Sequence, residues 1–256
     1  MGVTIRDSNA FSSTFARGLS VIEAFGLTNP RMSLSEIAGK TELDRAVARR
    51  LIITLVELGY AKKTGRTFEL TPQILSLGHS FLSSHGFGTL MTRDLDRLSI
   101  EIAETVSVSV WSGKNVTTIA RSNAAGRHVV TDSLGTSLPI HASAAGRVLI
   151  SALPQHEIMR LLEDADLNRF TSNTLTSPSE VLESIEIYRR SGWLISNEEL
   201  EIGLISAAIP LRDAMGNVLA SLNVSSQTSR MTKRRLEQEV IPKMVAASSS
   251  LMAHIV

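Results

Sequence analysis

The sequence contains no cysteine, and its 256 residues include no long uncharged apolar run. The absence of thiols excludes disulfides, thiolate zinc sites, iron–sulfur clusters and cysteine nucleophiles. A membrane-spanning helix needs roughly 18 or more consecutive apolar residues, which no segment provides. The N-terminus also lacks the basic and apolar regions of a signal peptide. We therefore expect a soluble, cytoplasmic protein with no membrane partner.

A strong excess of one charge is absent too, because 26 Lys and Arg face 25 Asp and Glu. The balance nevertheless varies along the chain. Residues 1–86 carry 10 basic and 7 acidic side chains, and the remainder carries 16 and 18. Most of the positive excess lies between Lys40 and Arg66, where it would suit contact with phosphate groups. Composition alone favours the simpler alternative, a solvated surface helix.

Three short helices are predicted in the N-terminal third. The first covers "FSSTFARGLSVIEAFG" and stops at Gly26. A capping box that begins at Ser33 starts the second helix, which we expect Gly39 to end. The third helix runs from an N-cap at Asp44 to Leu58.

The third helix has a basic end and an apolar end. At about 100° per residue, its apolar stripe comprises Val47, Leu51, Leu55 and Leu58. Arg45 and Arg49 lie opposite this stripe, and Arg50 lies between the two faces. Ile52 and Val56 continue the Arg45 side, so the C-terminal half is apolar nearly all round. Such a helix is typical of a helix-turn-helix, whose recognition helix presents its N-terminal residues to the major groove.

A β-hairpin is predicted directly after this helix, in "YAKKTGRTFELT". Its strands would cover residues 60–63 and 67–70, with the turn at Gly65. Basic side chains along such a wing can contact the sugar-phosphate backbone beside the groove. A wing that follows a recognition-type helix favours DNA binding over the solvated-surface alternative.

The segment after the hairpin is expected to connect two domains. A helix is predicted to begin with Pro72 at its first position and to end in the Gly- and Ser-rich stretch near residue 86. We accordingly expect a DNA-binding domain over residues 1–71, a linker helix over 72–86 and a second domain over 87–256.

The second domain alternates strands and helices. Strict alternation in "TVSVSVWSG", followed by "NVTTIARS", predicts a hairpin around Gly113. The other predicted strands cover residues 192–196, 204–213 and 217–226. The predicted helices cover about 90–103, 142–152, 155–163, 178–191 and 232–255. This order predicts an α+β fold with one mostly antiparallel sheet, which can form a wall of a small-molecule pocket.

Three segments resemble the IclR family of bacterial transcriptional regulators: "RGLSVIEAFG", "LPIHASAAGRVLISAL" and "SGWLISNEELEIGLISAAIPLRDAMGNVLASLNVSS". The resemblance covers the chain from Phe15 onward. The last segment is similar to the branch that regulates protocatechuate, 4-hydroxybenzoate and β-ketoadipate degradation. The resemblance implies a winged helix-turn-helix, a linker helix and a GAF-like effector-binding domain in a dimer or tetramer. The expected partners are a double-stranded DNA operator and a small organic acid, with no cofactor.

Candidate site residues follow from the patterns and the resemblance together. The candidates for DNA binding are Ser35, Arg45, Arg49, Arg50, Lys62, Lys63 and Arg66. The resemblance places the effector site at Ala144, Ala145, Ser196, Leu204, Ser206, Asn223 and Ser225. Backbone N–H groups at the start of the helix containing Ala144 would bind a carboxylate, and the hydroxyl and amide groups would add neutral hydrogen bonds. The sequence departs from the family at Ala144–Ala145, where this branch usually has Ser-Met, and at Val47, where the family often has threonine.

Two other classes of protein remain as alternatives. An enzyme could use His141, Ser143 or Glu199, but no G-x-S-x-G, H-E-x-x-H or phosphate-loop motif is present. We expect Glu198 and Glu199 instead to form caps or to pair with Arg212 or Arg147, with the pocket mouth as the alternative place for Glu199. A metal sensor would have to use histidines that show no i,i+4 spacing. These histidines are His79, His85, His128, His141, His156 and His254.

Overall fold

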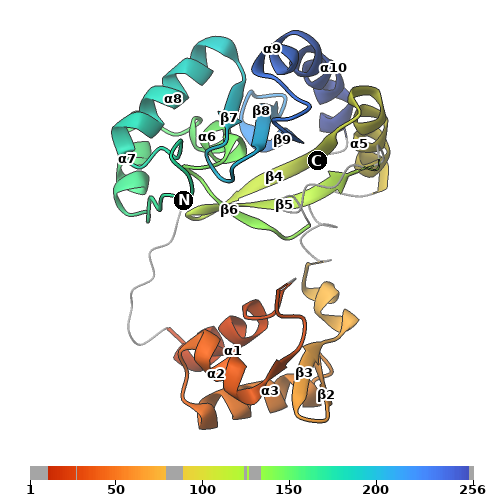
Figure 1. Ribbon diagram of the computed structural model, residues 1–256, viewed down its shortest axis with the longest axis vertical. Coiled ribbons are helices and arrows are strands. Elements are labelled where there is room, and N and C mark those ends of the chain that lie inside the picture. Colours follow the sequence, from red (N-terminus) through yellow and green to blue (C-terminus); the bar gives the residue numbers. More distant parts are fainter. Residues whose placement is uncertain (1–10, 27, 79–88, 124–125, 127–133, 254–256) are drawn as a thin grey trace. The chain divides into compact units, whose positions relative to one another are not determined.

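The computed structural model describes residues 11–26, 28–78, 89–123, 126 and 134–253 (Figure 1). The chain separates into two compact units, residues 1–81 and 82–256. Helices and strands mix in both, which confirms the predicted α+β class. Within the described residues, no helix is both long and apolar enough to cross a membrane.

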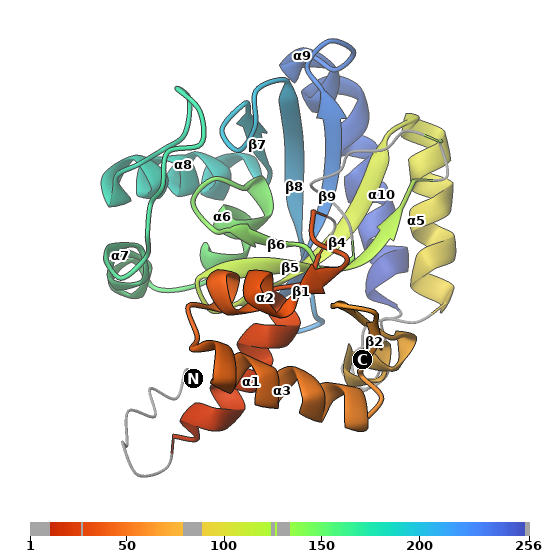
Figure 2. The same cartoon turned by 60° about the horizontal axis from the view of Figure 1, so that its bottom comes forward.

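The first unit is a winged helix-turn-helix, whose helices and wing are labelled in Figure 2. Its elements are α1 (Ser13–Glu23), β1 (Met32–Ser33), α2 (Leu34–Thr41), α3 (Arg45–Glu57), β2 (Ala61–Thr64) and β3 (Thr67–Leu70). The strands form an antiparallel sheet in the order β1-β3-β2. Val21, Ile37, Ile52 and Phe68 belong to the core that joins the three helices to this sheet.

The start of α2 follows the sequence prediction, but its end does not. The Ser33 amide donates to the Glu36 carboxylate at 2.7 Å, and the Glu36 amide donates to the Ser33 hydroxyl, as in a capping box. The helix continues through Gly39, and Glu42 takes the left-handed conformation with φ 55°. The chain turns there because Leu43 packs against the core. Asp44 precedes α3 as predicted, but its side chain makes no capping hydrogen bond.

The base of the wing is held by the residues that follow it. Thr71 donates to the carbonyl of Gly59, and the Gln73 side chain donates to the carbonyl of Leu58 at 3.0 Å. Gly59 has φ 81°, and a Cβ there would lie 2.6 Å from the Gln73 amide oxygen. Pro72–Ile74 form a 3-10 turn, η1, and residues 75–78 are helical. The rest of the predicted linker helix, residues 79–86, lies outside the described residues.

The second unit is built on one six-stranded sheet. Its strands are β4 (Thr105–Ser112), β5 (Asn115–Ser122), β6 (Ser137–Pro139), β7 (Leu194–Asn197), β8 (Leu204–Arg212) and β9 (Val218–Gln227). Their order is β6-β5-β4-β9-β8-β7, and every neighbouring pair is antiparallel. The helices are α5 (Thr89–Ile102), α6 (Ala144–Ile150), α7 (Gln155–Glu163), α8 (Pro178–Ser191), α9 (Lys233–Arg235), the π-helical η3 (Leu236–Val240) and α10 (Ile241–Met252).

Helices cover both faces of this sheet (Figures 1 and 2). On one face, α5 and α10 pack on Val106, Ile209 and Leu222. On the other face, α6 contacts the central strands, and α7 and α8 lie beside it. The sequence predicted α7, α8 and β5 with their observed bounds, whereas it missed the short strands β1 and β6 and treated α9, η3 and α10 as one helix.

Candidate functional site

The outward face of α3 is set by the residues that it buries. Ala48 and Ile52 are fully buried, and Leu55 is nearly so. The predicted stripe is therefore wrong in part, because Leu58 is 57% exposed. Arg50 stands two residues from both Ala48 and Ile52, about 200° around the helix axis. Arg50 thus points almost directly away from the core, which corrects its predicted sideways position.

Arg45, Arg49 and Arg50 are all exposed. Within the described part of the chain, their side chains make no hydrogen bond or ion pair. Ser35 is also exposed, near the start of α2, which packs against α3. Unpaired guanidinium groups at one end of a helix can exchange their solvent ions for DNA phosphates or contact guanine edges.

The basic residues of the wing fall into two groups. Lys63 and Arg66 are exposed next to the turn at Gly65, which has φ 61°. Lys62 instead forms an ion pair with Glu69 at 2.6 Å across the hairpin, and Arg31 pairs with the same carboxylate. The hydrogen bonds from Lys62 and then Arg31 lower the pKa of Glu69. Lys62 therefore has a competing partner that Lys63 and Arg66 lack among the described residues.

The sheet of the second unit is unusually polar on the face covered by α6. Small polar side chains on this face are buried or half-buried, namely Ser107, Ser109, Thr118, Ser196, Ser206, Ser221, Asn223 and Ser225. The alternate residues on the same strands form the apolar core under α5 and α10. An interior face with so many hydroxyl groups suits a polar ligand better than it suits simple packing.

A small cavity lies on this polar face. It is lined by Leu138, Ala142, Ser143, Ser196, Leu200, Leu204, Ser206 and Ser225. Its volume is about 30 Å³, which is room for roughly one water molecule. The structure thus gathers four of the predicted effector residues, Ser196, Leu204, Ser206 and Ser225, around one space. Leu138, Ala142 and Leu200 were missed, since only their neighbours carried a recognisable pattern.

The other three predicted effector residues do not line the cavity. Ala144 and Ala145 are buried at the start of α6, where the Ser143 hydroxyl already accepts from the Gly146 amide at 3.1 Å. Asn223 lies on the same face of β9 as Ser225, as predicted. Its side-chain amide group donates to the Ser109 hydroxyl at 3.0 Å and accepts from the Ser221 hydroxyl at 2.7 Å.

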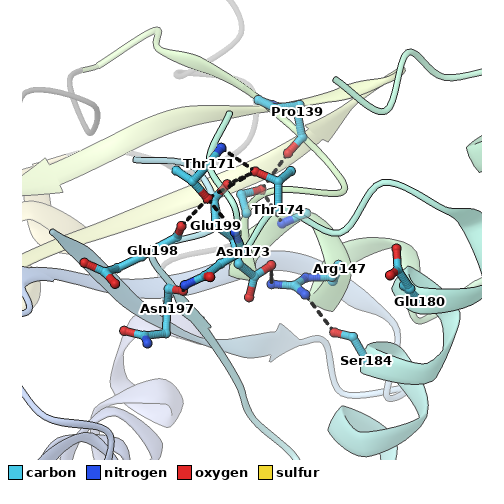
Figure 3. Close-up of polar contacts among 12 residues, drawn as sticks. Pro139, Arg147, Thr171, Asn173, Thr174, Glu180, Ser184, Asn197, Glu198 and Glu199 are labelled. Carbon is cyan, nitrogen blue, oxygen red and sulfur yellow. Dashed lines mark hydrogen bonds and ion pairs between the residues drawn. The ribbon is translucent and has the colours of Figure 1, made fainter. Parts of the chain in front are cut away.

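A buried ion pair lies beside the cavity wall (Figure 3). Arg147 on α6 is 1% exposed, and its Nη2 lies 2.8 Å from the Glu199 carboxylate. Its Nη1 donates to the Ser184 hydroxyl of α8 at 2.9 Å. The expected pairing of Glu199 with Arg147 is confirmed, whereas Arg212 donates to the Gly216 carbonyl.

The groups proposed for an enzyme are each engaged elsewhere. His141 Nε2 contacts the Asn168 carbonyl at 3.0 Å, and its ring stacks on Phe170. Burial is the main cause that lowers the pKa of His141. The Ser143 hydroxyl donates to the Pro139 carbonyl at 3.0 Å. No hydrogen bond joins His141, Ser143 and Glu199 to one another in the described structure.

The described residues also contain no group of three side chains suited to hold a metal ion. Two of the six histidines can be placed: His141 is buried and His156 is exposed. The other histidines, His79, His85, His128 and His254, lie outside the described residues.

Two family models match most of the chain. The model described as "IclR helix-turn-helix domain" matches residues 14–65. The model described as "Bacterial transcriptional regulator IclR C-terminal" matches residues 79–253. The chain belongs to the IclR family of bacterial transcriptional regulators. The recognition made from the sequence is thereby confirmed.

Relatives from the predicted branch are among the similar proteins. The chain is 39% identical to the Pca regulon regulatory protein of Pseudomonas putida, over 94% of this chain and 83% of that one. It is 33% identical to the p-hydroxybenzoate hydroxylase transcriptional activator of Acinetobacter baylyi, over 92% of this chain and 89% of that one. Both relatives are named as regulators.

Solved structures show the same folds. A putative transcriptional regulator from Rhodococcus sp. RHA1 is 36% identical, with a TM-score of 0.80 over 96% of this chain and 98% of that one. An Acinetobacter PobR inducer-binding domain, solved as a double mutant in complex with 3-hydroxybenzoic acid, is 30% identical. Its TM-score is 0.57, and the match covers 63% of this chain and 94% of that one.

Proposed function

We propose that this IclR-family protein is a transcriptional regulator of aromatic catabolism whose operator binding responds to a hydroxylated aromatic acid. Residues 1–71 would bind DNA, residues 87–256 would bind the effector, and residues 72–86 would connect the two. The observation that carries the effector assignment is the small cavity on the polar sheet face, which the predicted residues Ser196, Leu204, Ser206 and Ser225 line.

In the DNA-binding unit, we assign base contacts to the N-terminal half of α3. Arg49 and Arg50 occupy exposed positions from which a guanidinium can contact both acceptors of a guanine. Arg45 and Ser35 flank them, and Lys63 and Arg66 on the wing would contact phosphates. Lys62 would contribute less, because it is already paired with Glu69.

The effector assignment rests on chemistry and on relatives. The leucines of the cavity suit an aromatic ring, and its serines suit hydroxyl and carboxylate oxygens. The related PobR domain was solved with 3-hydroxybenzoic acid, and the other relatives regulate Pca and p-hydroxybenzoate hydroxylase genes by name. Ala144, Ala145 and Asn223 would act at the edge of the site rather than in the cavity.

Self-association would allow two recognition helices to contact successive major grooves. Helix α1 offers an apolar surface for it. Phe15 and Leu19 lie one turn apart on the helix and are 68 and 41% exposed, and Phe11, just before the helix, is 63% exposed. A second copy that covers this stripe would form a dimer, and a tetramer would need a further contact. The regulator would act in the cytoplasm, where its operator lies, and would not itself be an enzyme.

A thermal-shift screen tests the effector assignment. Aromatic acids with and without ring hydroxyls would be compared with short aliphatic acids. A ligand that binds the native state at 100 times its dissociation constant stabilises it by about 2.7 kcal/mol. We expect hydroxybenzoates to raise the melting temperature most. Stabilisation by aliphatic acids alone would contradict the assignment.

A further inference from the structure

The effector cavity is too small for the ligand class proposed above. Its volume is about 30 Å³, whereas a cavity that holds a benzene ring measures about 150 Å³. At least one wall of the cavity must therefore move before an aromatic acid can enter. The contacts around the cavity indicate which wall can do so.

Three of the walls are held by backbone contacts. The strands of the sheet that contribute Ser196, Ser206 and Ser225 are paired through continuous ladders. The edge strand β6, which carries Leu138, is paired with β5. The segment before α6 is equally constrained, because a Cβ on Gly146 would lie only 2.4 Å from the Ile140 backbone.

The remaining wall is the β7–β8 connection, residues 198–203, which contributes Leu200. We call these six residues the lid. Side chains of the neighbouring turn hold its near end, since Thr171 donates to the carbonyl of Glu198, and Thr174 donates to that of Glu199 at 2.6 Å. Figure 3 shows both threonines above the lid. The far end is held by the backbone, since the Thr228 amide donates to the Gly203 carbonyl at 2.8 Å. The part of the lid that carries Glu199 and Leu200 is thus fastened to the rest of the unit by side chains.

The Arg147–Glu199 ion pair is the buried part of this fastening. Glu199 precedes Leu200 in the lid, and Arg147 lies one helical turn after Ser143, so each partner adjoins a residue that lines the cavity. The contact is charged but poorly directed, because Nη2 and the carboxylate oxygen lie 2.8 Å apart without hydrogen-bond geometry. Nε of Arg147 is also buried and has no hydrogen-bond partner in the described part of the chain.

Nε and Nη2 of this buried guanidinium have no hydrogen-bond partner among the described residues, so both can donate to a carboxylate that lies in a better position. Opening the lid takes Glu199 away from Arg147 and would leave a buried positive charge unpaired, which is strongly unfavourable. An anion that replaces Glu199 removes this penalty. A neutral molecule of the same shape does not.

From these contacts, and resting on the proposed function, we infer that the effector carboxylate displaces Glu199 from Arg147. This exchange opens the lid and enlarges the cavity around the aromatic ring. Arg147 is then the residue that selects an acid over a neutral analogue, and Glu199 is an internal competitor for the same site. The residues predicted for the effector site included neither Arg147 nor Glu199, although the sequence led us to expect their ion pair.

Opposite effects of two variants test the carboxylate exchange. Binding of 4-hydroxybenzoate and of its neutral analogue 4-hydroxybenzamide would be measured by calorimetry on the full-length protein. Because an internal competitor lowers apparent affinity, Glu199→Gln should bind the acid roughly tenfold more tightly. The paired variant Arg147→Met with Glu199→Leu replaces the ion pair by apolar side chains and should lose the preference for acid over amide. Glu201→Gln, on the exposed part of the lid, is the matched control and should match wild type.

A merely structural ion pair would give a different pattern. Both variants would then bind the acid and the amide more weakly, in equal proportion, and that result would overturn the proposal. Weaker acid binding by Glu199→Gln alone would also overturn it. If wild type binds no aromatic acid in the panel, the proposed effector class and the exchange both fail.

Hydrogen exchange tests the lid independently of any effector. The amides of Glu198, Gly203 and Leu204 are bonded within the lid or at its ends. In Glu199→Gln, without added ligand, exchange in this segment should be faster by roughly tenfold or more. Exchange in the rest of the sheet should be unchanged, as should all exchange in Glu201→Gln. Unaltered exchange at residues 198–204, or faster exchange across the whole unit, would show that the ion pair does not fasten a lid.

Discussion

The two units of the molecule use arginine in opposite ways. On α3, Arg45, Arg49 and Arg50 are exposed to solvent without a protein partner in the described structure. On α6, Arg147 is 1% exposed and lies against Glu199. Exposed cations keep their hydration and exchange small ions for phosphates at little cost, whereas a buried cation depends on its counter-ion. The first arrangement suits a long polyanion, and the second suits one small anion that fits a defined space.

The largest expected effect comes from breaking the buried pair. Arg147→Ala leaves the Glu199 carboxylate buried without its partner, so we expect the free energy of unfolding to fall by about 3–5 kcal/mol. Denaturant unfolding of the full-length protein would measure it. The paired variant Arg147→Met with Glu199→Leu should recover most of the loss. Equal losses in the single and paired variants would mean that packing around Arg147, and not its charge, stabilises this region.

The exposed arginines should show the reverse behaviour. Arg49→Ala and Arg50→Ala each remove a candidate base contact and should weaken operator binding by about 1–3 kcal/mol. Their unfolding free energies should stay within about 0.5 kcal/mol of wild type. Fluorescence anisotropy with an operator duplex would measure the affinity. Unchanged binding by both variants would remove α3 from the role of recognition helix.

The wing should contribute through salt-dependent contacts. Arg66→Ala should reduce the slope of log affinity against log salt by about 0.9, the contribution of one phosphate contact. Lys62→Ala should reduce it less, since Lys62 is paired with Glu69. Glu69→Gln frees both Lys62 and Arg31, so it should increase affinity at low salt. A larger effect of Lys62→Ala than of Arg66→Ala would show that the ion pair between Lys62 and Glu69 breaks when the protein binds DNA.

The smallest expected effect is a pH dependence that comes from His141. Burial lowers the pKa of His141 in the folded state below its ordinary value of 6.5. The unfolded chain therefore takes up a proton first as the pH falls below about 6.5, and this uptake favours unfolding. Stability from this residue is present above that pH and is lost as the pH falls toward the folded-state pKa. His141→Gln should flatten the pH dependence of the melting temperature between pH 7.5 and 5.5, relative to wild type; an unchanged curve would assign it to other groups.

How far the sequence predicts this molecule depends on whether a feature is local. Helix α8 has the bounds predicted for it, and the structure shows local signals at both of its ends, a capping box at Ser177 and a left-handed glycine at residue 192. The prediction that Gly39 ends α2 was wrong, because the helix ends only where Leu43 packs against the core. That end depends on tertiary packing and not on the local sequence. The buried face of α3 was misplaced for the same reason, since α1 and α2 decide which side is covered.

The proposed effector site shows the same division between local and tertiary features. Alternation on β9 correctly placed Asn223 and Ser225 on one face. No sequence pattern indicated that Ser109 and Ser221 would occupy the Asn223 amide group. Leu138 and Leu200 were missed because they approach the cavity from segments far apart in the chain. The cavity's small volume, from which the lid was inferred, is a property of packing alone.

The central claim is that one acid controls how this protein binds DNA. Duplexes selected by the protein from a random pool would be labelled and titrated at fixed salt, with and without 4-hydroxybenzoate. The account predicts that a sequence with two related half-sites is enriched, that the acid changes its affinity several-fold, and that 4-hydroxybenzamide does not. Enrichment of no sequence, or an affinity that neither compound alters, would contradict it.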